Sequence, residues 1–492
     1  MSAPAKIRDL IRTRPEVLAL FGVLLFMNVY AFSGLKERPE YWYDEGLNVE
    51  LSRSVAEFGI PDIVIAPDTL SESGARIGST GYPITVLLGG VFKIFGVGVV
   101  QARLCMLLWM NALVISLFFA IRKRWGSQEA IGTLLLCTTF APFYGNGLTV
   151  MGEIPGLFFL LWSFYFFEQK TYWKSGLLLG LSVVSKPSVY LFFIPAFTVA
   201  LLFGKETGRE KLKNLCKLGV TSIAALVPWV LIYRDSVSRV SFWEGLFSHF
   251  KNPYGDFGFS VWGNIQNNLG GFFHSSTLIY FSLLTLAVLC ALAAERSLAR
   301  EHRTLLVVAL VYLPLSFFQY LKSLGYLRYL IATEFLLFLL FVLVLPTLTR
   351  FALNYVPFLS VRVSRAAGAV LTVLILFQAV HLFWFSDLYS GRSAEMTVAY
   401  IQLVYPEGVI GIINAPQVGS LISPHRKYQY LSTFGLTKFG VNPVFLAPEK
   451  MPVAIVTDGK NNILSLEEQE LLLMRYAPDV TFTEDFLVYK KK

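Results

Sequence analysis

Long apolar segments recur along most of this chain and constrain its fold more than any other feature. Eleven of them can be traced by composition, at residues 16–35, 97–121, 127–145, 152–168, 175–186, 188–203, 216–233, 275–293, 304–321, 327–349 and 367–386. The hydrocarbon core of a bilayer is about 30 Å thick, and a helix needs about 20 residues to cross it. Since lipid offers the backbone no hydrogen-bond partner, each span must pair its own peptide groups. We therefore predict a polytopic α-helical membrane protein with about eleven spans.

The overall composition agrees with this prediction. Of the 492 residues, 55% are hydrophobic and only 15% are charged, whereas about a quarter of the residues in a soluble protein are charged. The mean hydropathy is +0.57. The net charge of +9 comes from basic residues in short loops between apolar segments, which is the topology signal of a membrane protein. We therefore expect the membrane as a partner and no nucleic acid.

The basic loops also predict the orientation of the chain. If the N-terminus is cytoplasmic, every loop on that side carries lysine or arginine, from Lys6 at the start to Arg365 before the last span, as the positive-inside rule requires. The stretch 81–96, GYPITVLLGGVFKIFG, is short and interrupted by two glycines and a lysine. We expect it to lie along the outer interface as a juxtamembrane helix, not to span. The C-terminus then lies outside.

Three regions are placed on the outer side of the membrane: 36–96, 234–274 and the tail after 386. The tail has the composition of a soluble protein, and its apolar runs predict both strands and helices. Strands are expected at 408–413, 452–458 and 486–490, and helices at 394–405 and 464–476. The predicted organisation is a transmembrane domain at 1–386, which includes both outer loops, and a small extracytoplasmic α/β domain at 387–492.

Two adjacent carboxylates, Asp44 and Glu45, open the stretch YDEGLNVELSRSVAEFG just where the chain leaves its first span. On a helix over 44–58, Asp44 continues an apolar stripe through Leu51, whereas Glu45 turns about 100° away toward Asn48. An acid on an apolar face is costly unless it has a partner or a role. Asp44 is therefore our candidate catalytic base and Glu45 a supporting group. The alternative is that both acids only favour a helix N-terminus.

The other charged residues of this helix, Glu50, Arg53 and Glu57, follow one another at spacings of 3 and 4. They fall on the side that the apolar stripe leaves polar. We expect them to form a solvated ladder of ion pairs.

Further charged residues lie at the predicted outer ends of spans: Glu153, Lys186, Arg103 and Arg328. Glu153 is either a second carboxylate of an outer cavity or a complement to a helix dipole. Lys186 either faces that cavity or snorkels to the interface. Arg328 has no acid nearby in the sequence, so we expect it to need an anionic partner.

Carboxylates beside cations at one membrane depth suit a reaction between a hydroxyl and a phosphate-bearing lipid. A carboxylate can accept the hydroxyl proton as a general base, and lysine and arginine can stabilise the charge of a departing phosphate. From these residues alone a transporter stays an alternative, because transporters also use intramembrane charges.

Several common motifs do not occur in the sequence. There is no G-x-x-x-x-G-K-[ST] loop, no D-x-D, H-E-x-x-H, G-x-S-x-G or C-x-x-C, and the five histidines are scattered. No ATPase engine and no histidine metal site are therefore predicted. We assign no cofactor, and a divalent metal ion is left open.

Five of these stretches together resemble the polytopic GT-C glycosyltransferases, most closely the protein mannosyltransferase and aminoarabinose transferase (PMT/ArnT-like) superfamily. They occur in the family's order within residues 1–350: YDEGLNVELSRSVAEFG, GYPITVLLGGVFKIFG with QARLCML, MGEIPGLFFLLWSFYFF, GLLLGLSVVSKPSVYLFFIP and GYLRYLIATEFLLFL. They are similar, in turn, to the acidic loop after the first span, the outer juxtamembrane helix with its following span, the second acidic loop, the lysine segment and the Arg-Tyr span start.

The resemblance implies a GT-C fold and an enzyme that moves a hexosyl or pentosyl group from a polyprenyl-phosphate donor to an acceptor hydroxyl outside the membrane, with inversion. The acceptor would be a lipid, a glycan or a protein. Asp44 would be the base, while Glu45 and Glu153 would shape the site. The donor phosphate would contact Lys186, Arg328 and Arg103.

The acceptor is predicted to contact aromatic residues of the outer regions, namely Tyr82, Trp243 and Trp262, whose rings can stack on sugars. An interfacial aromatic belt would explain the two tryptophans equally well. The expected location is a bacterial cytoplasmic (inner) membrane. The alternatives to a transferase are a lipid-glycan flippase or another transporter, and a non-catalytic scaffold in which Asp44 is dispensable.

Overall fold

The structure of the protein is a computed structural model. It describes residues 15–67, 69–70, 80–234, 260–354, 362–385, 390–423, 427–431, 451–459, 466–482 and 485–492. Trp243 and most of the predicted outer loop 234–274 lie outside the described residues.

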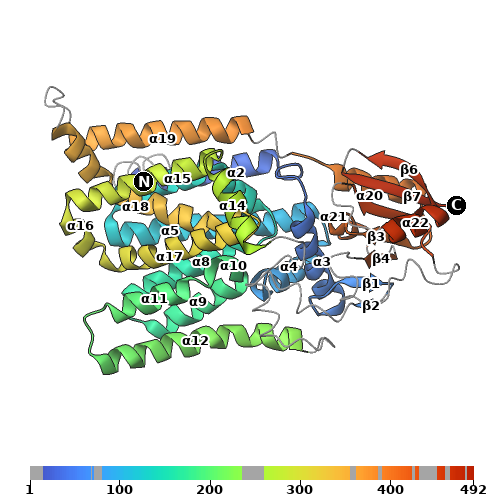
Figure 1. Cartoon of the computed structure of the whole chain (residues 1–492), viewed down its shortest axis with the longest axis horizontal. Coiled ribbons are helices and arrows are strands. Elements are labelled where there is room, and N and C mark those ends of the chain that lie inside the picture. Colours follow the sequence, from blue (N-terminus) through green and yellow to red (C-terminus); the bar gives the residue numbers. More distant parts are fainter. Residues whose placement is uncertain are drawn as a thin grey trace, which may run out of the picture.

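Long apolar helices form one end of the molecule, on the left of Figure 1. Within the described residues, seven helices are long and apolar enough to cross a membrane, or eight if a bent pair of helices counts as one span. The seven are α2 (Pro15–Ser33), α5 (Val99–Trp125), α12 (Gly208–Arg234), α15 (Ser276–Ala294), α17 (Arg303–Lys322), α18 (Ile331–Asn354) and α19 (Val363–Phe385). A polytopic helical membrane protein is thereby confirmed, while the count of eleven spans stays a prediction.

Shorter helices occupy the remaining predicted spans. They are α6 (Ser127–Thr138), α7 (Ala141–Leu148), α8 (Glu153–Glu168), α9 (Tyr172–Ser185), α10 (Pro187–Tyr190) and α11 (Phe193–Leu202). The span predicted at 127–145 is not one continuous helix, because this segment breaks between α6 and α7. Pro142 in the first turn of α7 disfavours continuation of the helix before it. α7 and α8 form the bent pair, with an angle of 104° between them.

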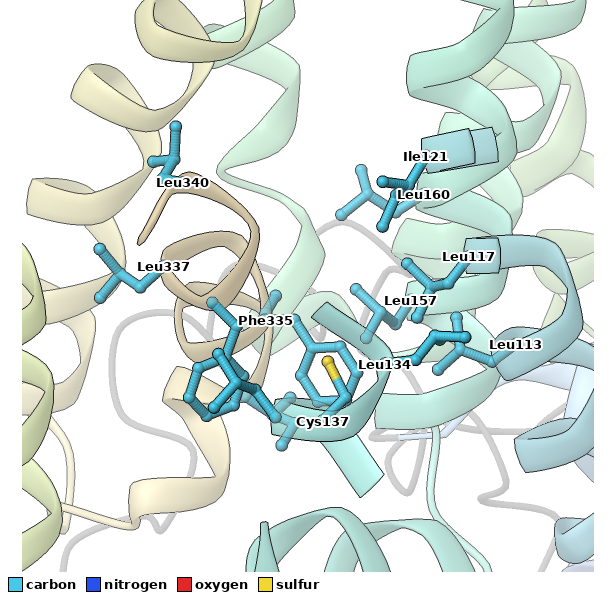
Figure 2. Packing of buried hydrophobic residues seen from close by; sticks show 14 of the residues in the cluster. Leu113, Leu117, Ile121, Leu134, Cys137, Leu157, Leu160, Phe335, Leu337 and Leu340 are labelled. Atoms are coloured by element: carbon cyan, nitrogen blue, oxygen red, sulfur yellow. The ribbon is translucent and has the colours of Figure 1, made fainter. Parts of the chain in front are cut away.

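The helical bundle is built around α18. Its apolar window is 83% buried, whereas that of α19 is 17% buried and that of α12 is 22% buried. Accordingly, α19 and α12 lie at opposite edges of the bundle in Figure 1. Figure 2 shows part of the core, where leucines of α5 and α8 and Cys137 of α6 gather near Phe335 of α18. Two small helices complete this part, α14 (Val261–Phe272) and α16 (Arg296–Glu301), and a 3-10 turn, η2 (Leu327–Leu330), precedes α18.

A mixed five-stranded sheet forms the other end of the molecule, on the right of Figure 1. The strand order is β4-β3-β5-β7-β6, in which β3 pairs in parallel with β4 and β5, and β7 pairs antiparallel with β5 and β6. The elements are α20 (Ser393–Val404), β3 (Ile410–Ile413), α21 (Pro416–Gly419), β4 (Tyr428–Leu431), β5 (Ala454–Asp458), α22 (Leu466–Arg475), β6 (Tyr476–Phe482) and β7 (Phe486–Lys491). All three predicted strands and both predicted helices are found, and β4, β6 and α21 were not predicted.

Two helices and a small hairpin lie between the bundle and the sheet (Figure 1). They are α3 (Tyr43–Phe58), α4 (Tyr82–Phe95), β1 (Val64–Ala66) and β2 (Thr69–Leu70). α3 ends at Gly59, whose left-handed φ of 78° is the usual glycine stop signal. α4 is the short apolar stretch that we expected not to span, and its 14 residues reach only about 21 Å. It is not among the candidate spans.

One hydrophobic cluster joins this middle layer to the sheet. It contains Val49 and Leu51 of α3, Leu88 of α4, Ile412 of β3 and Val456 of β5, all buried. The core therefore continues across residue 387, where the sequence suggested a domain boundary. Whether residues 387–492 form a separate folding unit stays a prediction.

Candidate active site

One pair of predicted site residues, Asp44 and Arg328, meets between the start of α3 and the turn before α18. The Arg328 Nη2 atom lies 2.7 Å from Asp44 Oδ2. The guanidinium is also stacked against rings: its centre lies 4.5 Å from the centroid of Trp42 and 4.7 Å from that of Tyr326. Arg328 thus has the anionic partner that the sequence required, and the aromatic rings fix its orientation. Asp44 stays 31% exposed, so its carboxylate is accessible from outside the protein.

The second pair joins the start of α8 to the junction of α9 and α10. The Lys186 Nζ atom lies 3.7 Å from Glu153 Oε1, and both side chains are buried. Neither carboxylate oxygen of Glu153 has a hydrogen-bond partner among the described residues. A buried carboxylate without hydrogen bonds is costly, so a bound group that donates to it would be stabilised there.

Glycine makes this second pair possible. A Cβ atom added at Gly152 would lie 1.7 Å from the backbone oxygen of Ser185. No other residue type allows the two chain segments to approach so closely. This contact places Glu153, the next residue, beside Lys186. Tyr190 also stabilises the contact between these two segments, because its hydroxyl donates to the backbone oxygen of Glu153.

The two pairs belong to one charged cluster. The positive charge of Lys186 interacts with Glu153 and also with Arg328 and Asp44. Four of the predicted site residues are therefore brought together by four separate parts of the chain. Arg328 in η2 meets the start of α3, and Lys186 at the start of α10 meets the start of α8. α3 lies at the end of the helical bundle that faces the sheet (Figure 1).

Glu45 and Arg103 form a third pair that is fully buried. Arg103 donates from Nε at 3.1 Å and from Nη2 at 3.0 Å to the two Glu45 oxygens, and also to the backbone oxygens of Leu35 and Pro39. Burial raises the pKa of Glu45, although Arg103 opposes this shift. Such a closed pair supports the chain before α3 and leaves the Arg103 guanidinium no exposed surface.

The periodicity of α3 predicted its burial incorrectly. Asp44 was expected on a buried apolar face, yet Glu45 and Asn48 are the buried residues, and Asn48 donates to the backbone oxygen of Val150 at 2.7 Å. The apolar stripe ends in Phe58, which is 41% exposed. The helix is enclosed on several sides, so one apolar stripe does not define its interior.

The solvated ladder predicted at Glu50, Arg53 and Glu57 is also wrong. Arg53 does pair with Glu57, at 2.9 Å, but Glu50 and Arg53 are buried. They face the sheet, whose Tyr428 donates a hydrogen bond to Glu50. This partner could not be predicted from the sequence, because it lies 378 residues away.

The predicted acceptor residues are more dispersed. The Tyr82 hydroxyl donates to the backbone oxygen of Ala225 in α12, at 3.1 Å. Trp262 lies on α14 and is 66% exposed. α14 is held near the end of α17 by Asn264 and Asn268, which donate to backbone oxygens there. The structure brings neither aromatic residue into the charged cluster.

Sequence reasoning missed several residues around the cluster. Trp42, Tyr326 and Tyr190 contact its members, but aromatic residues at a membrane interface carry no distinguishing pattern. Glu334, in the first turn of α18, is a buried acid within an apolar run, and that isolation was a usable signal. Within the described residues, no three His, Cys, Asp or Glu side chains come together as a metal site.

Comparison with known proteins gives a family match for part of the chain and a match for its fold. A sequence model of the dolichyl-phosphate-mannose-protein mannosyltransferases matches residues 84–233. A search of curated proteins found no match. The fold is similar to the crystal structure of ArnT from Cupriavidus metallidurans bound to undecaprenyl phosphate, with a TM-score of 0.63, 14% identity, and coverage of 97% of this chain and 98% of that one.

Two further solved structures share the fold. The apo form of the same ArnT gives a TM-score of 0.62 at 15% identity, covering 96% of this chain and 97% of that chain. The Archaeoglobus fulgidus oligosaccharyltransferase, in complex with Zn and sulfate, gives 0.53 at 13% identity, covering 97% of this chain and 73% of that chain. The resemblance predicted from the sequence motifs is confirmed: residues 84–233 match the protein mannosyltransferase model, and the chain shares its fold with ArnT and with an archaeal oligosaccharyltransferase.

Proposed function

We propose that the protein is a membrane glycosyltransferase that moves a hexosyl or pentosyl group from a polyprenyl-phosphate donor to an acceptor hydroxyl. The single observation that carries this proposal is the cluster of Asp44, Arg328, Glu153 and Lys186 at one end of the bundle. It combines the accessible carboxylate of Asp44 with two cationic side chains, Arg328 and Lys186, that are each fixed by an ion pair. Undecaprenyl phosphate bound to the structurally similar ArnT supports a donor of this class.

In the proposed reaction, the acceptor oxygen attacks the anomeric carbon on the face opposite the phosphate. The new carbon–oxygen bond forms as the bond to the phosphate oxygen breaks, which inverts the anomeric centre. Asp44 accepts the hydroxyl proton. Arg328 and Lys186 bind the donor phosphate and stabilise its charge as it departs. Because an alkyl phosphate is a weak base, its departure needs no protonation.

The contact between Asp44 and Arg328 predicts that the donor binds before Asp44 acts as the base. While the guanidinium of Arg328 contacts Asp44 Oδ2, that oxygen is not free to accept from an acceptor hydroxyl. When a donor phosphate binds, the Arg328 guanidinium turns from Asp44 to the phosphate, because a bidentate arginine–phosphate contact is strong. The Asp44 carboxylate is then released to accept from the acceptor hydroxyl only when the donor is present. Glu153, whose oxygens lack hydrogen bonds, accepts from hydroxyls of the bound sugar.

We assign Arg103 and Glu45 a supporting role in place of the phosphate-binding role that the sequence suggested for Arg103. Their bidentate pair is enclosed and uses all three donating nitrogens within the protein. It holds the entry to α3, and with it the neighbouring Asp44, against α5. No step of the proposed reaction passes through a metal.

The finer features of the sequence-based prediction complete the proposal. We propose about eleven spans, a cytoplasmic N-terminus, and an α/β region that lies outside the cytoplasmic (inner) membrane of a bacterium. This orientation rests on the basic residues of the loops. It puts the charged cluster on the outer side, where the acceptor lipid, glycan or protein would be reached. Trp243 and Trp262 would then be available for the acceptor.

The test uses purified full-length protein in detergent and a labelled polyprenyl-phosphate sugar. Asp44→Asn should lower turnover by roughly 10²–10⁴-fold, the usual contribution of a general base, while polyprenyl phosphate still binds. Glu37→Gln is the matched control, because Glu37 is an exposed carboxylate just before α3. It should retain near wild-type turnover. The proposal would be wrong if Asp44→Asn were fully active. It would also be wrong if the wild type neither bound nor used the donor.

A further inference from the structure

The inner face of α3 is bound to the sheet by buried charges. Arg53 is 2% exposed and donates from Nη1 to the backbone oxygens of Ile422, at 2.9 Å, and Gly419, at 3.4 Å. Its guanidinium lies 5.3 Å from the ring centroid of Tyr428. The Tyr428 hydroxyl donates to Glu50, one turn before Arg53 on the same helix. We call Glu50, Arg53 and Tyr428 the α3–sheet network.

Several neutral contacts reinforce this network along the same face. A Cβ atom added at Gly46 would lie 2.4 Å from the backbone nitrogen of Gln417 in α21, so α3 approaches this helix, which follows β3, at backbone distance. Ahead of the helix, the Tyr41 hydroxyl lies 2.8 Å from Ser420 Oγ. On another side, a Cβ at Gly89 of α4 would lie 2.6 Å from Val55. The helix is therefore enclosed by both α4 and the sheet.

Burying these charges is not the most stable solution for such an interface. Apolar residues of similar volume often stabilise a buried site as well as an ion pair or better, whereas directional polar contacts specify a register. A slip of α3 by one residue would rotate its side chains by about 100° and shift them by about 1.5 Å. Arg53 would then lose its two carbonyl partners, and Asp44 would move away from Arg328.

We propose that the α3–sheet network positions Asp44, so that the C-terminal sheet takes part in catalysis without touching substrate. Glu50, Arg53 and Tyr428 are positioning residues in this proposal, and they act through α3. Arg53 is nine residues from Asp44, which is about 13.5 Å along a helix. The inference rests on the proposed function for its effect on turnover, but the effect on α3 itself does not depend on that function.

The experiment compares two tyrosines of the same sheet in the full-length protein. Tyr428→Phe removes the hydroxyl that binds Glu50 but keeps the ring beside Arg53. Tyr476→Phe is the control, since its buried hydroxyl donates to Pro452 at 2.8 Å, within the sheet region and away from α3. Hydrogen–deuterium exchange of the α3 amides and steady-state kinetics are measured for both variants. Tyr428→Leu and Arg53→Lys extend the series.

In Tyr428→Phe the α3 amides should exchange roughly three- to tenfold faster, because a buried hydrogen bond contributes about 0.5–1.5 kcal/mol. The kcat should fall by a similar factor, with the KM for the donor within about twofold. Tyr428→Leu should be more affected, and Tyr476→Phe should match the wild type in both measurements.

Equal α3 exchange in Tyr428→Phe and Tyr476→Phe would overturn the inference. Faster α3 exchange with unchanged kcat would also overturn it, because the network would then only stabilise the fold. If the wild type transfers no sugar, the proposed function fails on that result alone, while the exchange comparison still decides whether the sheet holds α3.

Discussion

At the scale of single residues, the charged cluster is made of pairs that differ in enclosure. Asp44 and Arg328 form an accessible pair, Glu153 and Lys186 a buried pair without supporting hydrogen bonds to the carboxylate, and Glu45 and Arg103 a closed bidentate pair. These differences in enclosure suggest that the three pairs have different functions. The accessible pair is suited to chemistry, the second to binding, and the third to support.

The variant Lys186→Met distinguishes a role of Lys186 in binding the donor phosphate from a role in stabilising the fold. The change leaves the buried Glu153 carboxylate without its cation, which costs about 3–5 kcal/mol of stability for a broken buried pair. The Kd for polyprenyl phosphate should also rise by at least tenfold. The double variant Lys186→Met/Glu153→Gln should regain much of the stability but none of the affinity.

Thermal unfolding in detergent, with and without polyprenyl phosphate, measures both quantities. Wild-type affinity in the double variant would show that Lys186 does not bind the phosphate, and would remove it from the proposed mechanism.

The sequence predicted the residues of this cluster better than their surroundings. Asp44, Glu153, Lys186 and Arg328 could be found because a charge near an apolar span is expensive and therefore conspicuous. Which acid meets which cation could not be found, since Asp44 and Arg328 are nearly 300 positions apart. The burial of Glu50 and Arg53 was misjudged for a similar reason: their partner, Tyr428, lies on a strand that was not predicted.

At the scale of elements, the site depends on places where two backbones nearly touch. The approach of Gly152 to Ser185 brings the start of α8 to the end of α9. The two helices therefore present Glu153 and Lys186 as one unit. Local sequence explains the helices themselves through apolar runs and helix stops, but it does not reveal such an approach.

Gly152→Ala should separate this unit. The added methyl group would overlap the Ser185 oxygen, and relief of such overlap typically costs about 1–3 kcal/mol. Because relief moves Glu153 away from Lys186, turnover should fall by more than tenfold. Gly145→Ala is the matched control, since a Cβ there meets nothing within 4 Å. Turnover and melting temperature are measured for both. Equal activity in the two variants would contradict the role given to this contact.

The sheet carries its own titrating contact between α20 and β6. Asp479 accepts hydrogen bonds from Tyr405 at 2.5 Å and Tyr400 at 2.7 Å, and these bonds lower its pKa. Asp479 therefore contributes stability above the ordinary aspartate pKa of about 3.9 and loses it as the pH falls. The same bond raises the pKa of Tyr400 to about 12. That contribution is present below about pH 10 and is lost as the pH rises toward 12.

We expect a stability plateau between about pH 5 and pH 9, with a decline on either side. Asp479→Asn should weaken both pH dependences, because it removes the acid itself and the charge that holds the tyrosine protons. Melting temperatures across this pH range, and tyrosinate absorbance at the alkaline end, provide the measurement. An Asp479→Asn profile identical to that of the wild type would exclude this contact as a source of pH dependence.

At the scale of the whole molecule, the middle layer of α3 and α4 shares a hydrophobic core with the sheet. The hydrophobic cluster around Val49, Ile412 and Val456 crosses from α3 to the strands, and Arg53 adds bonds that are shielded from water. Composition alone had suggested a boundary at 387, because residues on its two sides differ in polarity. The polarity of a segment indicates whether lipid or water surrounds it. It does not indicate which other segments it packs against.

This shared core predicts that the sheet stays attached after the chain is cut. A protease site inserted between α19 and α20 should yield two fragments that elute together from a sizing column in detergent. Because the contacts are apolar or buried, 1 M salt should not separate them, although salt screens exposed charges. Separation of the fragments in mild detergent would show that the connection through α19 is what holds the sheet in place.

The contact between α3 and the sheet also bears on how the protein is made. Tyr41 bonds to Ser420 and Glu50 to Tyr428 across sequence separations of 379 and 378 residues. At ~5–20 residues per second, synthesis of the later partners follows by roughly 20–75 s. During that time the N-terminal helix has no sheet to meet. A prematurely terminated chain would therefore reach the membrane with most of its helices but without the strand contacts that hold α3.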